Sequence, residues 1–200
     1  SRCEARDANP APLFFRRQGW LLVIGMVHAY LLWFGDILVF YAVVGTLMWL
    51  FRHRPPQKLI AIALVFLPIA PLLGFISGAY LEDLKAEAEA IEQRVIEGLS
   101  ISDEQQQTLG EWLEDRPAIA PTDAETQDDV LAYRADYRTI LEHRAPFVYA
   151  LHNVGIWFFG IWRIGGLMLI GMALYKLGVF GPECRASLFH RVMVAGYGIG

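Results

Sequence analysis

Cysteine is scarce in this sequence, which has 200 residues and only two cysteines, Cys3 and Cys184. Two cysteines so far apart fit neither the spacing of a metal site nor a disulfide framework. The sequence also lacks the G-x-S-x-G, H-E-x-x-H, P-loop and G-x-G-x-x-G patterns, which mark common hydrolases, zinc proteases and nucleotide-binding proteins. We therefore predict no metal and no cofactor.

Charged residues are also few, and they are segregated along the chain. Only 19% of the residues are charged, 55% are hydrophobic, and the mean hydropathy is +0.35. The stretch from Glu82 to Arg144 holds seventeen acidic and six basic side chains, whereas the other 137 residues hold four acidic and eleven basic ones. The net charge of −4 therefore combines two opposite populations and does not indicate nucleic-acid binding.

Long apolar runs dominate the first part of the chain. Residues 19–34 contain one strongly polar side chain, His28, and residues 37–51 contain no charge. A helix needs about 20 apolar residues to cross a hydrocarbon core of about 30 Å. The two runs together are too long for one span and slightly short for two. We predict a hairpin of short membrane helices that turns at Gly35 and Asp36, a little below the membrane surface.

The predicted fold is all-α: a polytopic transmembrane helix bundle with a short-helix hairpin and a small helical extracytoplasmic insertion. Its expected segments are a cytoplasmic loop (1–13), three transmembrane helices within 14–80 (14–34, 37–51 and 59–80), an acidic insertion (81–145), a transmembrane helix (146–176), a cytoplasmic loop (177–191) and the start of a fifth transmembrane helix (192–200). The chain begins without methionine and stops in an apolar run, so we expect a piece of a longer membrane protein.

Basic residues indicate the orientation of these spans. They cluster at Arg16-Arg17, in the loop from Arg52 to Lys58, and at Lys176, Arg185 and Arg191. The positive-inside rule places all three clusters in the cytoplasm and the acidic segment outside. The expected localisation is the bacterial inner membrane, with several passes.

Local patterns predict helix ends and a kink. Pro68 and Pro71 predict a kink within the third span. Capping boxes at Ser102 with Gln105 and at Thr122 with Glu125 predict the starts of two helices, the first running through Trp112. Apolar residues at helical spacing predict that the third span continues into the insertion (Leu81, Leu84, Ala88, Ile91, Val95) and that one helix follows the second box (Val130, Tyr133, Tyr137, Ile140, Leu141).

Four polar residues should lie near the outer end of the bundle: His28, Asp36, His152 and Asn153. A carboxylate with one or two histidines can relay protons, act as a general base or hold a polar ligand. Alternatively, each imidazole satisfies a backbone carbonyl and Asp36 merely caps the helix that starts at Ile37. We predict that His28, Asp36 and His152 share one polar cavity.

Arg163 lies at the centre of the span predicted over 146–176. A central Arg costs at least about 2.5–3.5 kcal/mol on insertion scales, so its charge needs a carboxylate, water or carbonyls, or must snorkel from a tilted helix. A depth count places Asp36 about 20 Å away, which disfavours direct pairing. A partner in further parts of a longer chain is the alternative.

One stretch resembles the signature of the YeiB-type family of bacterial polytopic inner-membrane proteins. The matching residues are Ile24-Gly25, His28, Leu31-Leu32-Trp33, Gly35-Asp36-Ile37-Leu38, Tyr41 and Val44-Gly45. A second motif of the family resembles Trp162, residues 166–174 and Gly178. The resemblance implies a multi-span inner-membrane protein with further helices on both sides. It adds Tyr41 to the hypothetical ligand or proton pathway of His28, Asp36, His152, Asn153 and Arg163.

The family has no established activity and is generally assigned to transport. Transport or handling of a small molecule is therefore the first functional hypothesis, with the lipid bilayer, an unknown small molecule and the remaining helices of the full-length chain as partners. A more distant likeness to membrane acyltransferases of the heparan-glucosaminide acetyltransferase type, which use an intramembrane His, supports the alternative of acyl transfer to an extracytoplasmic acceptor. That family's motif is not reproduced residue by residue. A non-catalytic membrane scaffold is the third hypothesis.

Overall fold

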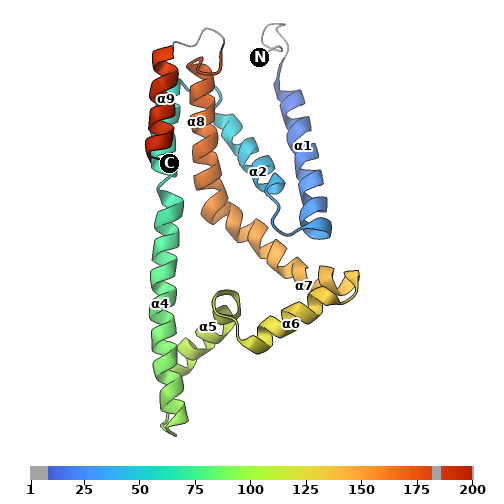
Figure 1. The fold of residues 1–200 in the computed structure, drawn as a ribbon, viewed down its shortest axis with the longest axis vertical. Helices are drawn as coiled ribbons and strands as arrows, with labels where there is room; N and C mark the ends of the chain where they lie inside the picture. Colours follow the sequence, from blue (N-terminus) through green and yellow to red (C-terminus); the bar gives the residue numbers. More distant parts are fainter. Residues whose placement is uncertain (1–8, 182–185, 200) are drawn as a thin grey trace. The chain divides into compact units, whose positions relative to one another are not determined.

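The structure is a computed structural model that describes residues 9–181 and 186–199, and every regular element in these residues is a helix. The all-α prediction is confirmed for this part of the chain. The chain divides into two compact units, which we describe separately (Figure 1). Unit 1 comprises Ser1–Ala70 and Phe147–Gly200, and unit 2 comprises Pro71–Pro146.

Unit 1 is built from α-helices joined by π- and 3₁₀-helical segments. In chain order these are α1 (Ala11–Val27), the π-helix η2 (His28–Leu32), α2 (Leu38–Met48), the 3₁₀-helix η3 (Trp49–Phe51), α3 (Pro56–Phe66), the π-helix η4 (Leu151–Ile164), α8 (Gly165–Lys176) and α9 (Ala186–Ile199). Helix α2 lies between α1 and α8 (Figure 1). Its apolar residues form one buried cluster with α3 and α8: Val44, Met48, Leu59, Ala63, Leu169 and Ala173.

Unit 1 also carries large apolar side chains on its outside. Trp20, Leu32 and Leu64, for example, are each about two-thirds exposed. Two helical stretches of the described residues, Pro56–Ile96 and Tyr137–Lys176, are long and apolar enough to cross a membrane, and Leu38–Phe51 is a shorter apolar helix. These features agree with a membrane environment, in which apolar surface needs no cover from protein.

The hairpin turns over residues 33–37, around the predicted Gly35 and Asp36. Helix α1 begins at Ala11, inside the predicted loop 1–13, because Pro12 is tolerated in a first turn, where its missing N–H costs nothing. Helix α9 begins at Ala186, inside the predicted loop 177–191, so Arg191 is helical; Arg185 lies outside the described residues.

At the predicted kink the structure has a two-residue turn within the helical stretch Pro56–Ile96. Helix α3 ends at Phe66, and α4 (Ile69–Ile96) begins after a turn at Leu67 and Pro68. Proline explains this turn because it has no N–H to donate and its ring clashes with the preceding helical turn.

Unit 2 contains most of α4, with α5 (Asp103–Ile119), α6 (Asp123–Arg134) and the start of α7 (Tyr137–Ala150). Leu84 and Ala88 of α4 are buried against Trp112 of α5, and Ile91 is also buried. Val95 is half exposed, so the predicted apolar face ends before it.

Both capping boxes are confirmed. Gln105 N–H donates to Ser102 Oγ at 3.3 Å and the Gln105 amide oxygen accepts from Ser102 N–H at 3.1 Å. The equivalent bonds join Thr122 and Glu125 at 3.3 and 2.7 Å. Helix α5 runs seven residues past Trp112, and on this extension Arg116 pairs with Glu125 at 2.8 Å.

The single helix predicted after the second box is wrong: α6 ends at Arg134 and α7 starts at Tyr137. Asp136 explains the break, because its carboxylate accepts hydrogen bonds from the hydroxyl and backbone N–H of Thr139, as an N-cap does. Two other helix ends use a glycine in the left-handed conformation, Gly98 after α4 (φ 75°) and Gly178 after α8 (φ 73°).

Candidate functional site

Asp36 is the centre of the candidate site. Only 3% of the residue is exposed, and each carboxylate oxygen has its own partner. Oδ1 lies 2.9 Å from His28 Nδ1, and Oδ2 accepts the backbone N–H of Val39, also at 2.9 Å. Asp36 therefore accepts a backbone N–H at the start of α2, as a cap does, and pairs with His28 at the same time.

The π-helix η2 positions His28. His28 is its first residue, and the carbonyl of His28 accepts the N–H of Trp33 at 2.8 Å, which is an i→i+5 bond. The chain then leaves the helix at Trp33, whose backbone is extended, and the next helix, α2, begins at Leu38, two residues after Asp36. Short π-helical segments often occur at functional sites. The His28 side chain is 33% exposed, and Nδ1 makes its one hydrogen bond among the described residues.

Gly25 allows the start of α2 to lie directly against α1. A Cβ at residue 25 would lie 2.8 Å from the backbone N of Val39 and 2.9 Å from its Cγ2, distances that real side chains do not adopt. The start of α2 therefore contacts the α1 backbone directly. This contact holds Asp36 beside the helical turn that carries His28.

His152 is the second residue of η4 and is 9% exposed. Its ring meets the edges of two aromatic rings, Tyr30 at 5.8 Å and Phe40 at 6.1 Å between centroids. Asp36 exerts a coulombic interaction on it. Neither ring nitrogen has a hydrogen-bond partner among the described residues. Leaving a buried polar group unsatisfied costs about 1–3 kcal/mol, so such groups deserve a functional explanation.

Two glycines of η4 admit the Phe40 ring that covers His152. A Cβ at Gly160 would lie 2.9 Å from Phe40 Cδ1, and one at Gly155 would lie 3.4 Å from Phe40 Cζ. Phe40 also belongs to a buried cluster with Val39 and Ile156. The His152 environment thus depends on a close contact between α2 and η4.

The other three predicted site residues lie elsewhere. Asn153 is exposed, and its side-chain amide donates to the carbonyl of Tyr149 at 2.9 Å. Tyr41 is exposed on α2, and Arg163 is exposed on η4 with no ion pair among the described residues. The structure brings His28 and Asp36 together, with His152 in electrostatic range, and separates Tyr41, Asn153 and Arg163 from this cluster.

Sequence reasoning did not select Tyr30 or Phe40 as site residues. The Tyr30 ring lies against that of His152, with centroids 5.8 Å apart. The available signal for Phe40 was the pair Gly155 and Gly160, whose missing side chains leave room for a bulky partner.

The cluster supports acid–base chemistry. With the carboxylate ionised, Nδ1–H of His28 donates to Asp36, which fixes the imidazole and leaves Nε2 as a base. The described residues contain no group of three or more potential metal ligands of the types His, Cys, Asp and Glu. Proton transfer at Nε2 of His28 and hydrogen bonding to His152 are chemistry that these side chains can offer.

Comparison with known proteins gives one relative of similar sequence. No family model and no solved structure matches this chain. "Uncharacterized protein YxaH" of Bacillus subtilis (strain 168) is 39% identical over 74 residues, which are 36% of this chain. The match spans only 18% of the relative's length.

Proposed function

We propose that this chain is part of a multi-pass protein of the bacterial inner membrane that transports or otherwise handles a small polar molecule by proton exchange at Asp36 and His28. The observation that carries the proposal is the pair of the buried Asp36 carboxylate with the His28 imidazole at 2.9 Å. His152 lies nearby, and its buried ring nitrogens have no hydrogen-bond partner among the described residues. An ionisable group within a membrane-spanning region is a functional-site hypothesis by default.

Several features support the membrane assignment. Unit 1 exposes large apolar side chains, and two helical stretches are long enough to span a bilayer. The basic clusters favour a cytoplasmic location for residues 52–58 and 176–191 and an extracytoplasmic location for residues 81–145. The resemblance to the YeiB-type family supports the same location. The relative YxaH is uncharacterised and adds no activity.

The proposed mechanism assigns a different role to each side chain. His28 accepts a proton at Nε2, and Asp36 stabilises the resulting imidazolium through Nδ1–H. Because its ring nitrogens have no hydrogen-bond partner in the described part of the chain, His152 can donate to or accept from a polar group of the transported molecule. The low local dielectric strengthens both interactions.

Metabolite profiling tests this proposal. A deletion strain is complemented with the wild-type full-length protein, with Asp36→Asn, or with Tyr41→Phe, a matched change on the exposed side of α2. We expect wild type and Tyr41→Phe to restore the wild-type profile and Asp36→Asn to leave the deletion profile, although all three proteins insert. Restoration by Asp36→Asn would contradict proton exchange at Asp36.

Acyl transfer is the second candidate, because the bond from Asp36 to Nδ1 leaves Nε2 of His28 as a general base. In that reaction Nε2 removes the proton of an acceptor hydroxyl, whose oxygen attacks the thioester carbonyl carbon. The C–S bond breaks, and the thiolate leaves with the proton from Nε2. Membranes would then release thiol from an acyl thioester in an acceptor-dependent manner, and His28→Gln would abolish this release. Absence of acceptor-dependent release from wild-type membranes supplied with a range of polar acceptors would count against the enzyme hypothesis.

A further inference from the structure

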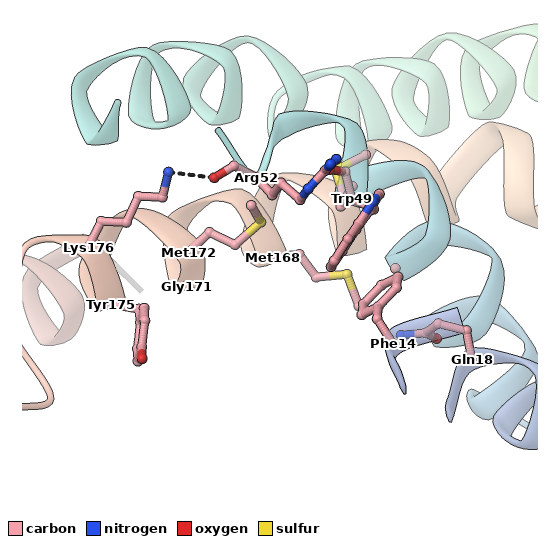
Figure 2. Close-up of a pocket in the computed structure, with 11 residues that line it drawn as sticks. Phe14, Gln18, Trp49, Arg52, Met168, Gly171, Met172, Tyr175 and Lys176 are labelled. Atoms are coloured by element: carbon pink, nitrogen blue, oxygen red, sulfur yellow. Dashed lines mark hydrogen bonds between the residues drawn. The ribbon is translucent and has the colours of Figure 1, made fainter. Parts of the chain in front are cut away.

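A cavity lies at the other end of α2 from Asp36. It has a volume of about 670 Å³ and opens between α1, the α2–η3 segment and α8 (Figure 2). Its walls include none of the residues of the His28–Asp36–His152 cluster. The cavity therefore needs an explanation of its own.

Most of the cavity wall is apolar. Phe14 of α1 stacks on Trp49 of η3 with ring centroids 4.3 Å apart, and Met168 and Met172 of α8 line the same space (Figure 2). Methionine side chains are flexible and adapt to irregular apolar shapes. This surface suits a hydrocarbon chain better than a polar solute.

Two cationic side chains, Arg52 and Lys176, also line this cavity. The Arg52 guanidinium lies 4.3 Å from the centre of the Trp49 ring, and Nη1 donates to the Trp49 carbonyl at 3.2 Å. Lys176, the last residue of α8, donates to the carbonyls of Arg52 and Arg54, both at 2.6 Å. Figure 2 shows Lys176 reaching toward the Arg52 carbonyl. Backbone carbonyls satisfy hydrogen bonds but do not neutralise the two positive charges.

Neither Arg52 nor Lys176 makes an ion pair with a carboxylate among the residues that the structure describes. Among the residues that the structure describes in unit 1, Asp36 is the one acidic side chain, and it is paired with His28. The cavity thus combines a dicationic rim with an apolar wall. Its position at the last residue of α8 and just after η3 corresponds to the end of the predicted spans, where lipid head groups lie.

We infer that this cavity binds an anionic phospholipid, with its phosphate at Arg52 and Lys176 and an acyl chain along Met168 and Met172. Charge complementarity favours an anionic head group, and the apolar wall favours a lipid over a free phosphate. Basic pockets between membrane helices on the cytoplasmic side have this property in general. The inference goes beyond the proposed function and does not depend on it.

Fluorescence quenching of Trp49 tests this assignment in the full-length protein in detergent micelles. Phosphatidylglycerol or phosphatidylcholine with brominated acyl chains is added, and the signal of Trp49 is the difference between wild type and Trp49→Phe. We expect half-maximal quenching at a phosphatidylglycerol concentration at least about tenfold lower than that of phosphatidylcholine, because two cations favour the anionic lipid. Equal quenching by the two lipids would overturn the inference.

Matched variants separate this site from general attraction between basic residues and anionic lipid. Arg52→Gln with Lys176→Gln should remove the preference, whereas Arg54→Gln with Lys58→Gln removes two exposed charges from the same loop and should retain it. An equal loss of the preference for phosphatidylglycerol in both double variants would overturn the site. Gly171→Leu tests the site without changing a charge, since a Cβ at Gly171 meets nothing within 4 Å and the side chain would fill the cavity.

Gly171→Leu should weaken quenching by brominated phosphatidylglycerol at least about fivefold while the protein remains monodisperse. Unchanged quenching in this variant would place the lipid elsewhere. Glycerol 3-phosphate supplies the same phosphate without acyl chains. We expect it not to displace the lipid, and displacement at concentrations equal to those of the lipid would show that the cavity binds a soluble phosphate instead.

Discussion

Asp36 uses its two oxygens for two different purposes, a helix cap on Val39 and a pair with His28. Substitutions can separate these purposes. In Asp36→Asn the amide oxygen can still accept the Val39 N–H, so we expect the stability of the protein to remain near that of wild type. Asp36→Ala removes the cap and should cost about 1 kcal/mol more than Asp36→Asn.

Thermal unfolding of the two variants in detergent, followed by size-exclusion chromatography, measures this difference. Equal stability of Asn and Ala at residue 36 would show that the cap contributes little. Loss of function in Asp36→Asn without loss of stability would then assign function to the carboxylate charge.

Residue types alone indicated the polar residues of the candidate site but not the side chains that surround them. His28 and Asp36 are eight residues apart across a short turn, so their pairing is a local event that the sequence made predictable. Burial of His152 is not local, since it requires Phe40 from α2 to lie against Gly155 and Gly160 of η4. Arg163 shows the limit of a depth count, which gives a position along a helix but not the face on which a side chain lies.

At the scale of elements, α1 and α2 cross at a glycine. Because a Cβ at residue 25 would lie 2.8 Å from the Val39 backbone N, Gly25→Ala should push the helices apart and destabilise the protein by about 1–3 kcal/mol. Gly19→Ala is the matched control in the same helix, where a Cβ meets nothing within 4 Å. It should be neutral or stabilising, because alanine is the better helix former.

The unfolding temperatures of these two variants test the crossing. A Gly25→Ala protein as stable as Gly19→Ala would show that α1 and α2 are not in direct backbone contact. The Gly25→Ala variant should also weaken the His28–Asp36 pair, because the same crossing holds the two residues together.

The two capping boxes of unit 2 differ in one chemical respect: Gln105 does not titrate and Glu125 does. Hydrogen bonds from the backbone N–H and the hydroxyl of Thr122, together with Arg116, lower the pKa of the Glu125 carboxyl below its ordinary value of 4.5. A lowered pKa means that the folded state prefers the carboxylate. The stabilisation is present above about pH 4.5 and is lost as the pH falls through the lower pKa of the folded state.

Hydrogen exchange measured by mass spectrometry should therefore show protection at the start of α6 falling on acidification below pH 4.5, more than protection at the start of α5. Glu125→Gln should reduce this pH dependence while retaining the box, as Gln105 does. An equal response of the two helix starts in the wild type would contradict a titrating cap at Glu125.

Sequence reading located the capping boxes because capping depends on residues within one turn. It did not predict η2 and η4, since a π-helix changes the period of the buried positions. In η4 the buried residues are His152, Ile156 and Gly160, which recur every four residues, whereas an α-helix has 3.6 residues per turn. It also joined α6 and α7 into one helix, because the apolar spacing continues across Asp136 while its carboxylate starts a new helix.

At the scale of the whole molecule, the charge distribution predicts topology. In a background with Cys3→Ser and Cys184→Ser, a membrane-impermeant thiol reagent applied to intact cells should label Gln106→Cys and spare Gln57→Cys. Both positions are exposed, and they lie in the acidic segment and the basic loop, respectively. Permeabilised cells should give labelling at both. Labelling of Gln57→Cys alone in intact cells would invert the orientation.

The single acidic side chain described in unit 1 has an electrostatic consequence. Eight lysine or arginine residues are described in that unit, so among its described residues Asp36 is the one formal negative charge that attracts a cation. A proton or other cation that approaches is repelled by the remaining fixed charges, while an anion is drawn to them. Replacing Asp36 by a neutral residue would therefore leave formal charges of one sign among the described residues of unit 1.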